Sequence, residues 1–241
     1  MASAGLLVIG NEILSGKIVD TNSPFLAAQL RELGVDLERI LVIPDVVEII
    51  AEEVQRFSAA YDHVFTSGGI GPTHDDVTME SIAQAFGRDL VLDEQICTRI
   101  ERTQQKPLND AMKKMAYMPK GASVIDVSDL WFPVIVIENV HVLPGIPQLF
   151  EKKFLSIRDR FAGVPIHLTR IYVTRHESEI AEDLHALLRE FSELMLGSYP
   201  RIGEPDYRVM LTLESRDSNY LERATESLCA RLPGEAILRV E

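Results

Sequence analysis

The sequence has 241 residues, of which 46% are hydrophobic and 25% charged, the composition of a globular protein with one large domain or a medium and a small one. Its 24 basic and 37 acidic residues give a formal net charge of −13, and an acidic chain repels nucleic-acid phosphates and anionic lipids. We therefore expect no nucleic-acid partner and no membrane partner. A phosphorylated ligand has to be held by local groups, such as backbone amides or a metal ion.

The sequence shows no basic segment followed by an apolar run of signal-peptide length at its start, and no apolar run reaches the roughly 18 residues of a membrane helix. Its two cysteines, Cys97 and Cys229, lie far apart without metal-binding spacing. These features favour a cytoplasmic location with both thiols reduced.

Short apolar runs alternate with amphipathic segments over the first two-thirds of the chain. Strands are predicted at 6–10, 40–43 and 63–66, and a hairpin within 135–143. Helices are predicted to start near Asn22, at Asp45 and before Met79, and a further helix to end near Phe161. Residues 93–118 are expected to be helical but irregular. The alternation predicts an α/β domain over 1–163, with a mostly parallel sheet and helices on both faces.

The pattern changes after residue 163. Segments 168–174 and 207–214 alternate like half-exposed strands, and 177–191 and 219–232 have the periodicity of amphipathic helices. This β-α-β-β-α order predicts a second, small α+β domain over residues 164–241. The stretch 197–201, Gly-Ser-Tyr-Pro-Arg, fits a turn.

Three polar segments each follow a predicted strand of the first domain: residues 10–22, Pro44-Asp45 and residues 67–80. Ligands of open parallel sheets bind at the carboxyl ends of the strands. The three segments are therefore predicted to form one composite pocket.

The third segment contains three glycines in four positions, Gly68, Gly69 and Gly71, directly after a strand. Glycines allow backbone turns that point successive N–H groups into one concavity, which binds phosphate or another anion. Two hydroxyls, those of Ser67 and Thr73, can add donors. The structural alternative is an ordinary loop with Asp76 or Thr78 as a helix cap.

The carboxylates near this turn suggest a metal. Asp75 and Asp76 are adjacent, and two carboxylates beside a phosphate repel it unless a divalent cation lies between them; oxygen ligands suit Mg²⁺, Mn²⁺ or Co²⁺. In the long first segment, Glu12 and Asp20 could orient a ligand or metal, or Glu12 is only solvated while Asn22 or Ser23 caps the next helix. Asp45, followed three residues later by Glu48, fits a helix cap better than a site.

Together these motifs resemble the molybdopterin-binding (MoaB/Mog-like) domain family. The resemblance rests on the runs Gly-Asn-Glu-Ile-Leu-Ser-Gly at 10–16, Asp-Thr-Asn at 20–22, Gly-Gly-Ile-Gly-Pro-Thr-His-Asp-Asp-Val-Thr at 68–78 and Leu-Pro-Gly-Ile-Pro at 143–147. Within the family the sequence is similar to the competence-damage-inducible CinA branch, and more so to the N-terminal domain of eukaryotic FAD synthases, which share the glycine run and a Gly-Ser-Tyr-Pro segment. Two positions depart from the CinA pattern, Asn11 and His74.

The resemblance implies a three-layer α/β fold, a homodimer or homotrimer, and a phosphorylated small-molecule ligand, either a dinucleotide or a pterin such as molybdopterin. It implies that Asp45 and Asp76 act with a divalent metal. Together with the adjacent carboxylates, this leads us to expect Asp45, Asp75 and Asp76 to be catalytic and Asp75 and Asp76 to bind the metal. The residues expected to bind the ligand are Gly10, Asn11, Glu12, Gly16, Asp20, Asn22, Ser67, Gly68, Gly69, Gly71, Pro72, Thr73, Thr78, Glu80, Pro144 and Gly145.

Three functions are compatible with these expectations. The first is a divalent-metal-dependent pyrophosphatase that cleaves a dinucleotide such as FAD or ADP-ribose, as the resemblance to the CinA and FAD synthase branches implies. The second is a module that binds a pterin or nucleotide without turnover. The third is adenylylation of molybdopterin. The sequence given contains no segment for the amidohydrolase domain of CinA proteins or the adenylyltransferase domain of FAD synthases, so their activities are not expected here.

Overall fold

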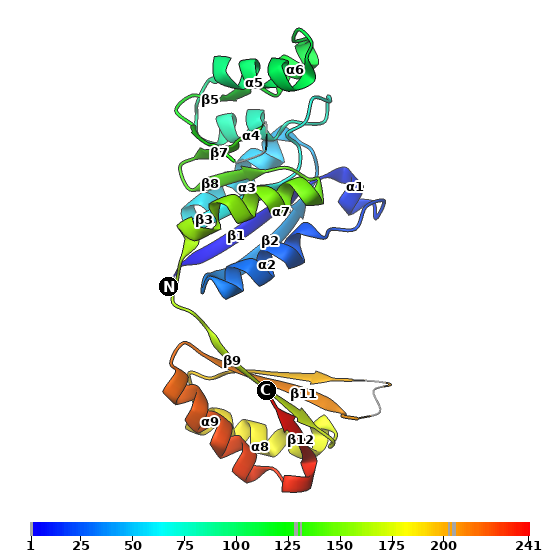
Figure 1. The fold of residues 1–241 in the computed structure, drawn as a ribbon, viewed down its shortest axis with the longest axis vertical. Coiled ribbons are helices and arrows are strands. Elements are labelled where there is room, and N and C mark those ends of the chain that lie inside the picture. The colour runs from blue at the N-terminus through cyan, green and yellow to red at the C-terminus, as the bar shows by residue number, and fades with distance from the viewer. Residues whose placement is uncertain (1, 128–129, 131, 202, 204–205) are drawn as a thin grey trace. The chain divides into compact units, whose positions relative to one another are not determined.

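The computed structural model describes residues 2–127, 130, 132–201, 203 and 206–241, and divides into two compact units, Met1–Gly163 and Val164–Glu241 (Figure 1). The elements of the first unit in chain order are β1 (Ser3–Ile9), α1 (Asn11–Leu14), α2 (Asn22–Glu32), β2 (Asp36–Ile43), α3 (Val47–Ala60), β3 (His63–Ser67), α4 (Thr78–Ala85), β4 (Leu90–Leu92), α5 (Glu94–Gln104), α6 (Asp110–Lys114), β5 (Tyr117–Pro119), β6 (Ser123–Ile125), β7 (Val134–Ile137), β8 (Val140–Leu143), α7 (Pro147–Ile157) and the 3₁₀ helix η1 (Arg158–Phe161).

The first unit is built on a six-stranded sheet with the order β2-β1-β3-β8-β7-β6. The first four of these strands are parallel, and β7 runs antiparallel to both of its neighbours. The register pairs Ile9 with Ile43 and Ser67 with Leu143, so the parallel strands end at nearly the same level. The loops that follow these four ends therefore share one edge of the sheet.

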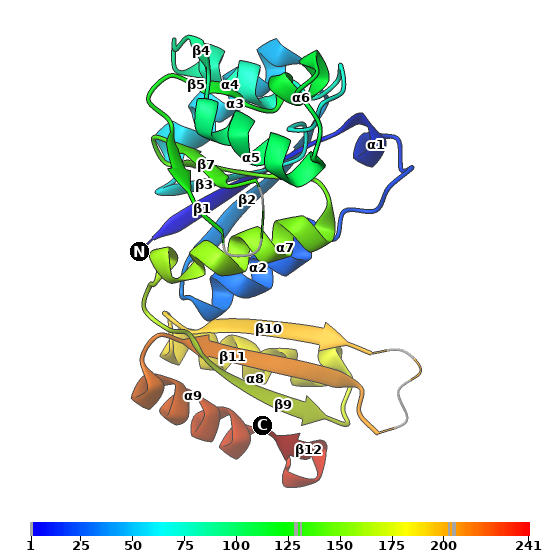
Figure 2. The ribbon, with the colours of Figure 1, turned by 45° about the horizontal axis from the view of Figure 1, so that its top comes forward.

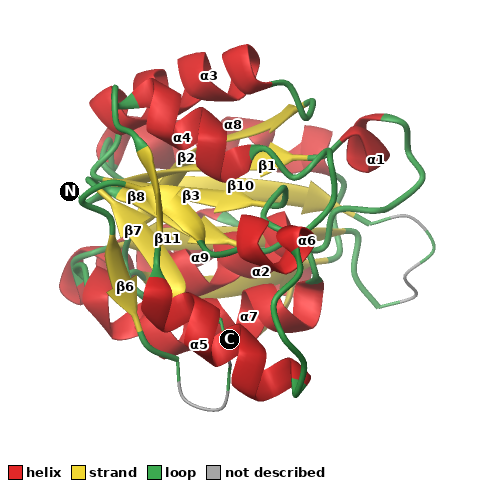
Figure 3. Cartoon of the chain, turned by 90° about the horizontal axis from the view of Figure 1, so that it is seen from above, coloured by secondary structure: helices red, strands yellow, loops and turns green. Residues whose placement is uncertain are grey.

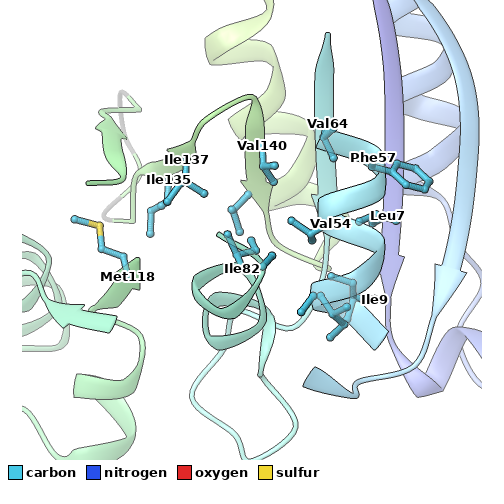
Figure 4. Packing of buried hydrophobic residues seen from close by; sticks show 14 of the residues in the cluster. Leu7, Ile9, Val54, Phe57, Val64, Ile82, Met118, Ile135, Ile137 and Val140 are labelled. Carbon is cyan, nitrogen blue, oxygen red and sulfur yellow. The ribbon is translucent and has the colours of Figure 1, made fainter. Parts of the chain in front are cut away.

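Helices cover both faces of this sheet, so the unit has three layers, and the predicted fold class is confirmed (Figure 3). Side chains of β1 alternate between the faces: Leu7 and Ile9 pack with α3 and α4, and Leu6 and Val8 with α2 and α7. Figure 4 shows the first of these two cores, in which Phe57 and Val54 of α3 lie beside strand residues. A period-two strand buried on both faces requires the continuous apolar run that the sequence shows.

Several boundaries differ from the predictions. The segment 10–22 contains the single-turn helix α1, and the helix predicted from Asp45 begins at Val47. The region 93–118 contains α5, α6 and the short strand β5, which pairs with β4. Strands of three residues are too short to give a periodic signal, which is why β4, β5 and β6 were missed.

The second unit comprises β9 (His167–Val173), α8 (Glu177–Glu190), β10 (Met195–Pro200), β11 (Val209–Ser215), α9 (Ser218–Arg231), the 3₁₀ helix η2 (Gly234–Ala236) and β12 (Ile237–Val240). Its sheet has the order β10-β11-β9-β12 and is antiparallel throughout. Both α8 and α9 lie on one face of it (Figure 2).

The core of the second unit lies between this sheet and its two helices, where Ile171, Leu211 and Leu184 are buried. The unit is the small α+β domain that the sequence indicated. Two of its details were predicted wrongly. Residues 197–200 belong to β10 and pair with β11, so they are not a turn, and a fourth strand, β12, follows α9. Within the described residues of either unit, no helix has the length and apolarity needed to cross a bilayer.

Candidate functional site

Backbone and side-chain hydrogen bonds connect the loops at the carboxyl edge of the large sheet. The amide of Gly10 donates to the carbonyl of Ile43 at 3.1 Å, and the amide of Asn11 donates to Oδ2 of Asp45 at 2.8 Å. Asp45 therefore fixes the loop after β1 to the end of β2. It is not the cap of α3, whose N-cap residue is Val46 with no side-chain cap.

Asn22 connects the loop after β1 to the other two strand ends. It is 5% exposed, and its Nδ2 donates to Oγ of Ser67 and to the carbonyl of Gly145, both at 2.9 Å. The capping role predicted for Asn22 or Ser23 belongs to Asp20 instead, whose Oδ1 accepts the amides of both residues at 3.0 and 3.1 Å. Asp20 thus has a structural role at the start of α2. Asn22 and Ser23 are already the first residues of that helix, so it is Asp20, which precedes the helix, that accepts their amides.

The turn after β3 has the backbone form that its glycines predicted. Gly68 and Gly69 have φ values of +109° and +67°, and a Cβ at either would overlap Ile9 O or Thr78 Oγ1. Thr78 is buried, and its Oγ1 donates to the carbonyl of Gly68 at 2.9 Å. Thr78 therefore stabilises the turn through this hydrogen bond.

Three consecutive amides of this turn are available to a ligand. The amide of Gly68 donates to the carbonyl of Leu143 at 3.2 Å. By contrast, the amides of Gly69, Ile70 and Gly71 donate no hydrogen bond within the described part of the chain. Amides without an acceptor in a glycine turn of this kind can form an anion-binding concavity.

A cavity of about 520 Å³ opens beside these amides. Its polar lining comes from Glu12, Asp76 and Lys153, and the N-terminus of α7 begins at its wall with Pro147. Most of the lining is apolar or glycine: Ile18, Gly68, Gly69, Ile70, Gly71, Pro72, Met115, Leu130, Phe132, Pro144, Gly145, Ile146, Pro147 and Leu149. A few polar groups in a mostly apolar cavity of this size are typical of a small-molecule site.

Two smaller cavities share walls with the large one. One, of about 150 Å³, shares the glycine turn and Asp76 and adds Glu80 and Lys114. The other, of about 50 Å³, shares Glu12 and Gly145 and adds Asp20, Asn22 and Ser67. The three cavities follow the carboxyl edge of the sheet.

The adjacent carboxylates Asp75 and Asp76 have different surroundings. Oδ2 of Asp76 accepts from the amide of Thr73 at 2.8 Å and from its hydroxyl at 2.6 Å, and Asp76 lines the cavity. The side chain of Asp75 is 58% exposed and lines none of the three cavities. Thr73, whose hydroxyl donates to Asp76, lines none of the three cavities. Gly16 lines none of them either; it has a φ of +70° and open space where a Cβ would lie.

No group of three or more His, Cys, Asp or Glu side chains that could hold a metal ion occurs in the described residues. Two carboxylates, from Glu12 and Asp76, do line the same cavity as the free amides. Mg²⁺ is commonly held by one or two carboxylates together with phosphates of the substrate. The residues present therefore fit a divalent ion that arrives with a phosphorylated ligand.

The sequence analysis did not single out Lys153, the cationic group of the large cavity. It lies on α7, is 2% exposed, and its Nζ donates to the carbonyl of Pro133 at 2.7 Å. Burial lowers the pKa of Lys153 to about 7. The sequence does contain a signal that this lysine is buried, because Lys153 falls on the apolar face of the helix together with Phe150 and Phe154.

Comparisons with known proteins agree with this architecture. The family profile described as "Probable molybdopterin binding domain" matches residues 5–160, and the profile described as "FAD synthase, middle domain" matches residues 165–241. A protein of Archaeoglobus fulgidus is 36% identical over 223 residues, which cover 92% of this chain and 94% of that protein.

A "Probable FAD synthase" of Caenorhabditis elegans is 34% identical over 263 residues, covering 98% of this chain and 51% of that protein. The chain thus spans about half the length of this relative. A crystal structure of the protein CinA, of unknown function, from Thermoplasma acidophilum is 30% identical with a TM-score of 0.62, and the match covers 66% of this chain and 97% of that one. The chain therefore belongs to the molybdopterin-binding domain family, combined here with a domain like the middle domain of FAD synthase.

Proposed function

We propose that this protein is a divalent-metal-dependent pyrophosphatase that cleaves a dinucleotide such as FAD or ADP-ribose. The proposal rests on one cavity that is lined both by Gly69, Ile70 and Gly71, whose amides donate no hydrogen bond within the described residues, and by Glu12 and Asp76. This combination suits a diphosphate, which needs hydrogen-bond donors and a cation to offset the repulsion of the carboxylates.

The chain's own residues would bind and orient the diphosphate. The amides of the glycine turn donate to phosphate oxygens, and the N-terminus of α7, beside Pro147, adds the positive end of a helix dipole. These donors are fixed before the ligand binds, because Thr78 holds the turn from behind. Fixed donors stabilise developing charge without reorganisation cost.

Asp76 and Glu12 would hold the metal ion, with the remaining ligands from phosphate oxygens and water. When bound, Mg²⁺, Mn²⁺ or Co²⁺ supplies charge neutralisation and acidifies a water molecule. The overall reaction adds one water across the phosphoanhydride, so that one phosphorus gains the water oxygen and two monophosphates leave. Asp45 takes part by positioning Asn11, the neighbour of Glu12.

A second candidate function is binding of a nucleotide or a pterin such as molybdopterin without turnover. The largely apolar lining of the 520 Å³ cavity favours it, because such walls suit a ring rather than a reacting diphosphate. It predicts that the ligand raises the melting temperature of the wild type and that no product forms.

The decisive experiment incubates the purified protein with FAD or ADP-ribose and each of the three metals, and measures AMP by chromatography. We expect AMP release that EDTA abolishes, and a loss of about 100-fold or more in Asp76→Asn. A smaller loss is expected in Asp75→Asn, whose side chain lines none of the cavities. Absence of AMP with every metal would refute the pyrophosphatase, and ligand-dependent stabilisation in the same samples would then support the binding module.

A further inference from the structure

The large cavity is lined in part by residues that have no role in the proposed binding of phosphate and metal. Its walls there are Leu130, Phe132, Leu149 and Lys153, none of which lines either of the smaller cavities. Three of these four side chains are apolar. A flat ring placed against them would displace water from apolar surface, which is favourable, whereas a second phosphate would have to be desolvated there at high cost.

Lys153 gives this apolar region one polar anchor. Its Nζ lies 4.4 Å from the centre of the Phe132 ring and donates to Pro133 O, and no carboxylate contacts it among the residues that the structure describes. An ammonium group has three N–H donors and no acceptor. One donor is used by Pro133, and Nζ has no second acceptor among the described residues, so a ligand in the cavity that Lys153 lines can supply one.

The chemistry of the anchor limits the rings that it can recognise. Below its pKa of about 7 the protonated Lys153 can only donate, so it favours a ring edge with a carbonyl oxygen and disfavours one with an amino group. Leaving such a buried donor without an acceptor is costly, which is how a polar group in an apolar site discriminates between similar ligands.

We propose that Lys153 and Phe132 form the base subsite of this protein, selective for nucleotides whose ring carries a carbonyl group. This inference rests on the proposed function only in assuming that the cavity binds a nucleotide. It assigns the carbonyl-bearing ring of a dinucleotide to this subsite, in preference to adenine. Of the two substrates considered above, the flavin dinucleotide is the one that has such a ring.

The test measures binding of three monophosphates, GMP, FMN and AMP, by isothermal titration calorimetry in the presence of Mg²⁺ at pH 6, where Lys153 carries its proton. GMP and AMP share their phosphate and ribose and differ at the ring edge, and none of the three contains the anhydride that a pyrophosphatase would cleave. We expect GMP and FMN to bind about 10- to 100-fold more tightly than AMP, the worth of one hydrogen bond to a charged group.

In Lys153→Met this preference should disappear while AMP affinity changes little. The matched control is Lys152→Met, which removes the same charge from an exposed neighbour on α7 and should leave the preference intact. Equal affinities for the three ligands in the wild type, or binding of none of them, would overturn the inference even if the variant failed to fold.

An equal loss for all three ligands in Lys153→Met would also overturn it, because Lys153 would then bind a group that they share, such as the phosphate. These outcomes are independent of AMP release from FAD or ADP-ribose, so failure of the base subsite and failure of the pyrophosphatase can be told apart.

Discussion

Replacing Lys153 by methionine removes a buried charge and keeps an unbranched, flexible side chain that can fill the same space. Burial lowers the pKa of Lys153 from its ordinary value of 10.5 to about 7. At about 1.4 kcal/mol per pKa unit, the charged form destabilises the folded state by about 5 kcal/mol. Methionine avoids this cost but leaves the carbonyl of Pro133 without its donor, a loss of about 1–3 kcal/mol. The variant should therefore be more stable than the wild type by about 2–4 kcal/mol at pH 6.

The advantage of the variant should depend on pH. Below pH 7 the folded and unfolded chains both keep the proton, and the full penalty of the buried charge is present. Between pH 7 and 10.5 the unfolded chain still binds a proton that the folded chain has lost, so wild-type stability rises with pH. From pH 6 to pH 10 the difference between variant and wild type should shrink by about 4 kcal/mol.

Equilibrium unfolding in urea at pH 6, 8 and 10 measures this difference. Far-UV circular dichroism is a suitable probe, because the first unit contains the helices α2, α3 and α7. Lys152→Met, on the exposed side of the same helix, should change the free energy of unfolding by less than about 0.5 kcal/mol at each pH. A stability difference for Lys153→Met that is the same at all three pH values would show that burial does not control the ionisation of this lysine.

Two further pairs of variants test the framework of the site. Asn22→Ala removes both hydrogen bonds of a buried amide and should lower the free energy of unfolding by about 1–3 kcal/mol. The control, Asn11→Ala at an exposed position, should lower it by less than about 0.5 kcal/mol. Equal effects in urea unfolding would argue against Asn22 as the link between the strand ends. Gly69→Ala should cost about 2–4 kcal/mol, because its Cβ meets the Thr78 hydroxyl in addition to the strain of positive φ, and Gly16→Ala, in open space, about 1 kcal/mol. If both glycine variants lower the melting temperature by the same small amount, the turn after β3 can relax and is not held rigidly by Thr78.

Much of the fold could be predicted from the sequence, because periodicity is a local property. The alternation of Leu6, Leu7, Val8 and Ile9 between two cores requires that both faces of β1 be buried, and the run of apolar residues already indicated this. The glycines after β3 likewise predicted a turn with positive φ, which Gly68 and Gly69 adopt. The placement of the site at the carboxyl ends of the strands follows from the parallel topology.

The sequence could not determine which polar side chains line the cavity. Asp75 and Asp76 are neighbours of the same residue type, yet only Asp76 lines the cavities described above. Asn22 resembles a helix cap in the sequence, but in the structure it bonds to residues 45 and 123 positions away. Local patterns contain no information about such distant partners.

The sequence by itself thus determined the strands, the helices, the glycine turn and the family resemblance, since each depends on residues close together in the chain. Only the tertiary structure decided that a lysine of α7 lines the cavity beside Phe132 and that the carboxylates of Glu12 and Asp76 share its wall. The physical reason is that burial depends on how distant segments pack. Packing changes the environment of a charged group, and with it the pKa and chemistry of that group, without any change in the neighbouring sequence.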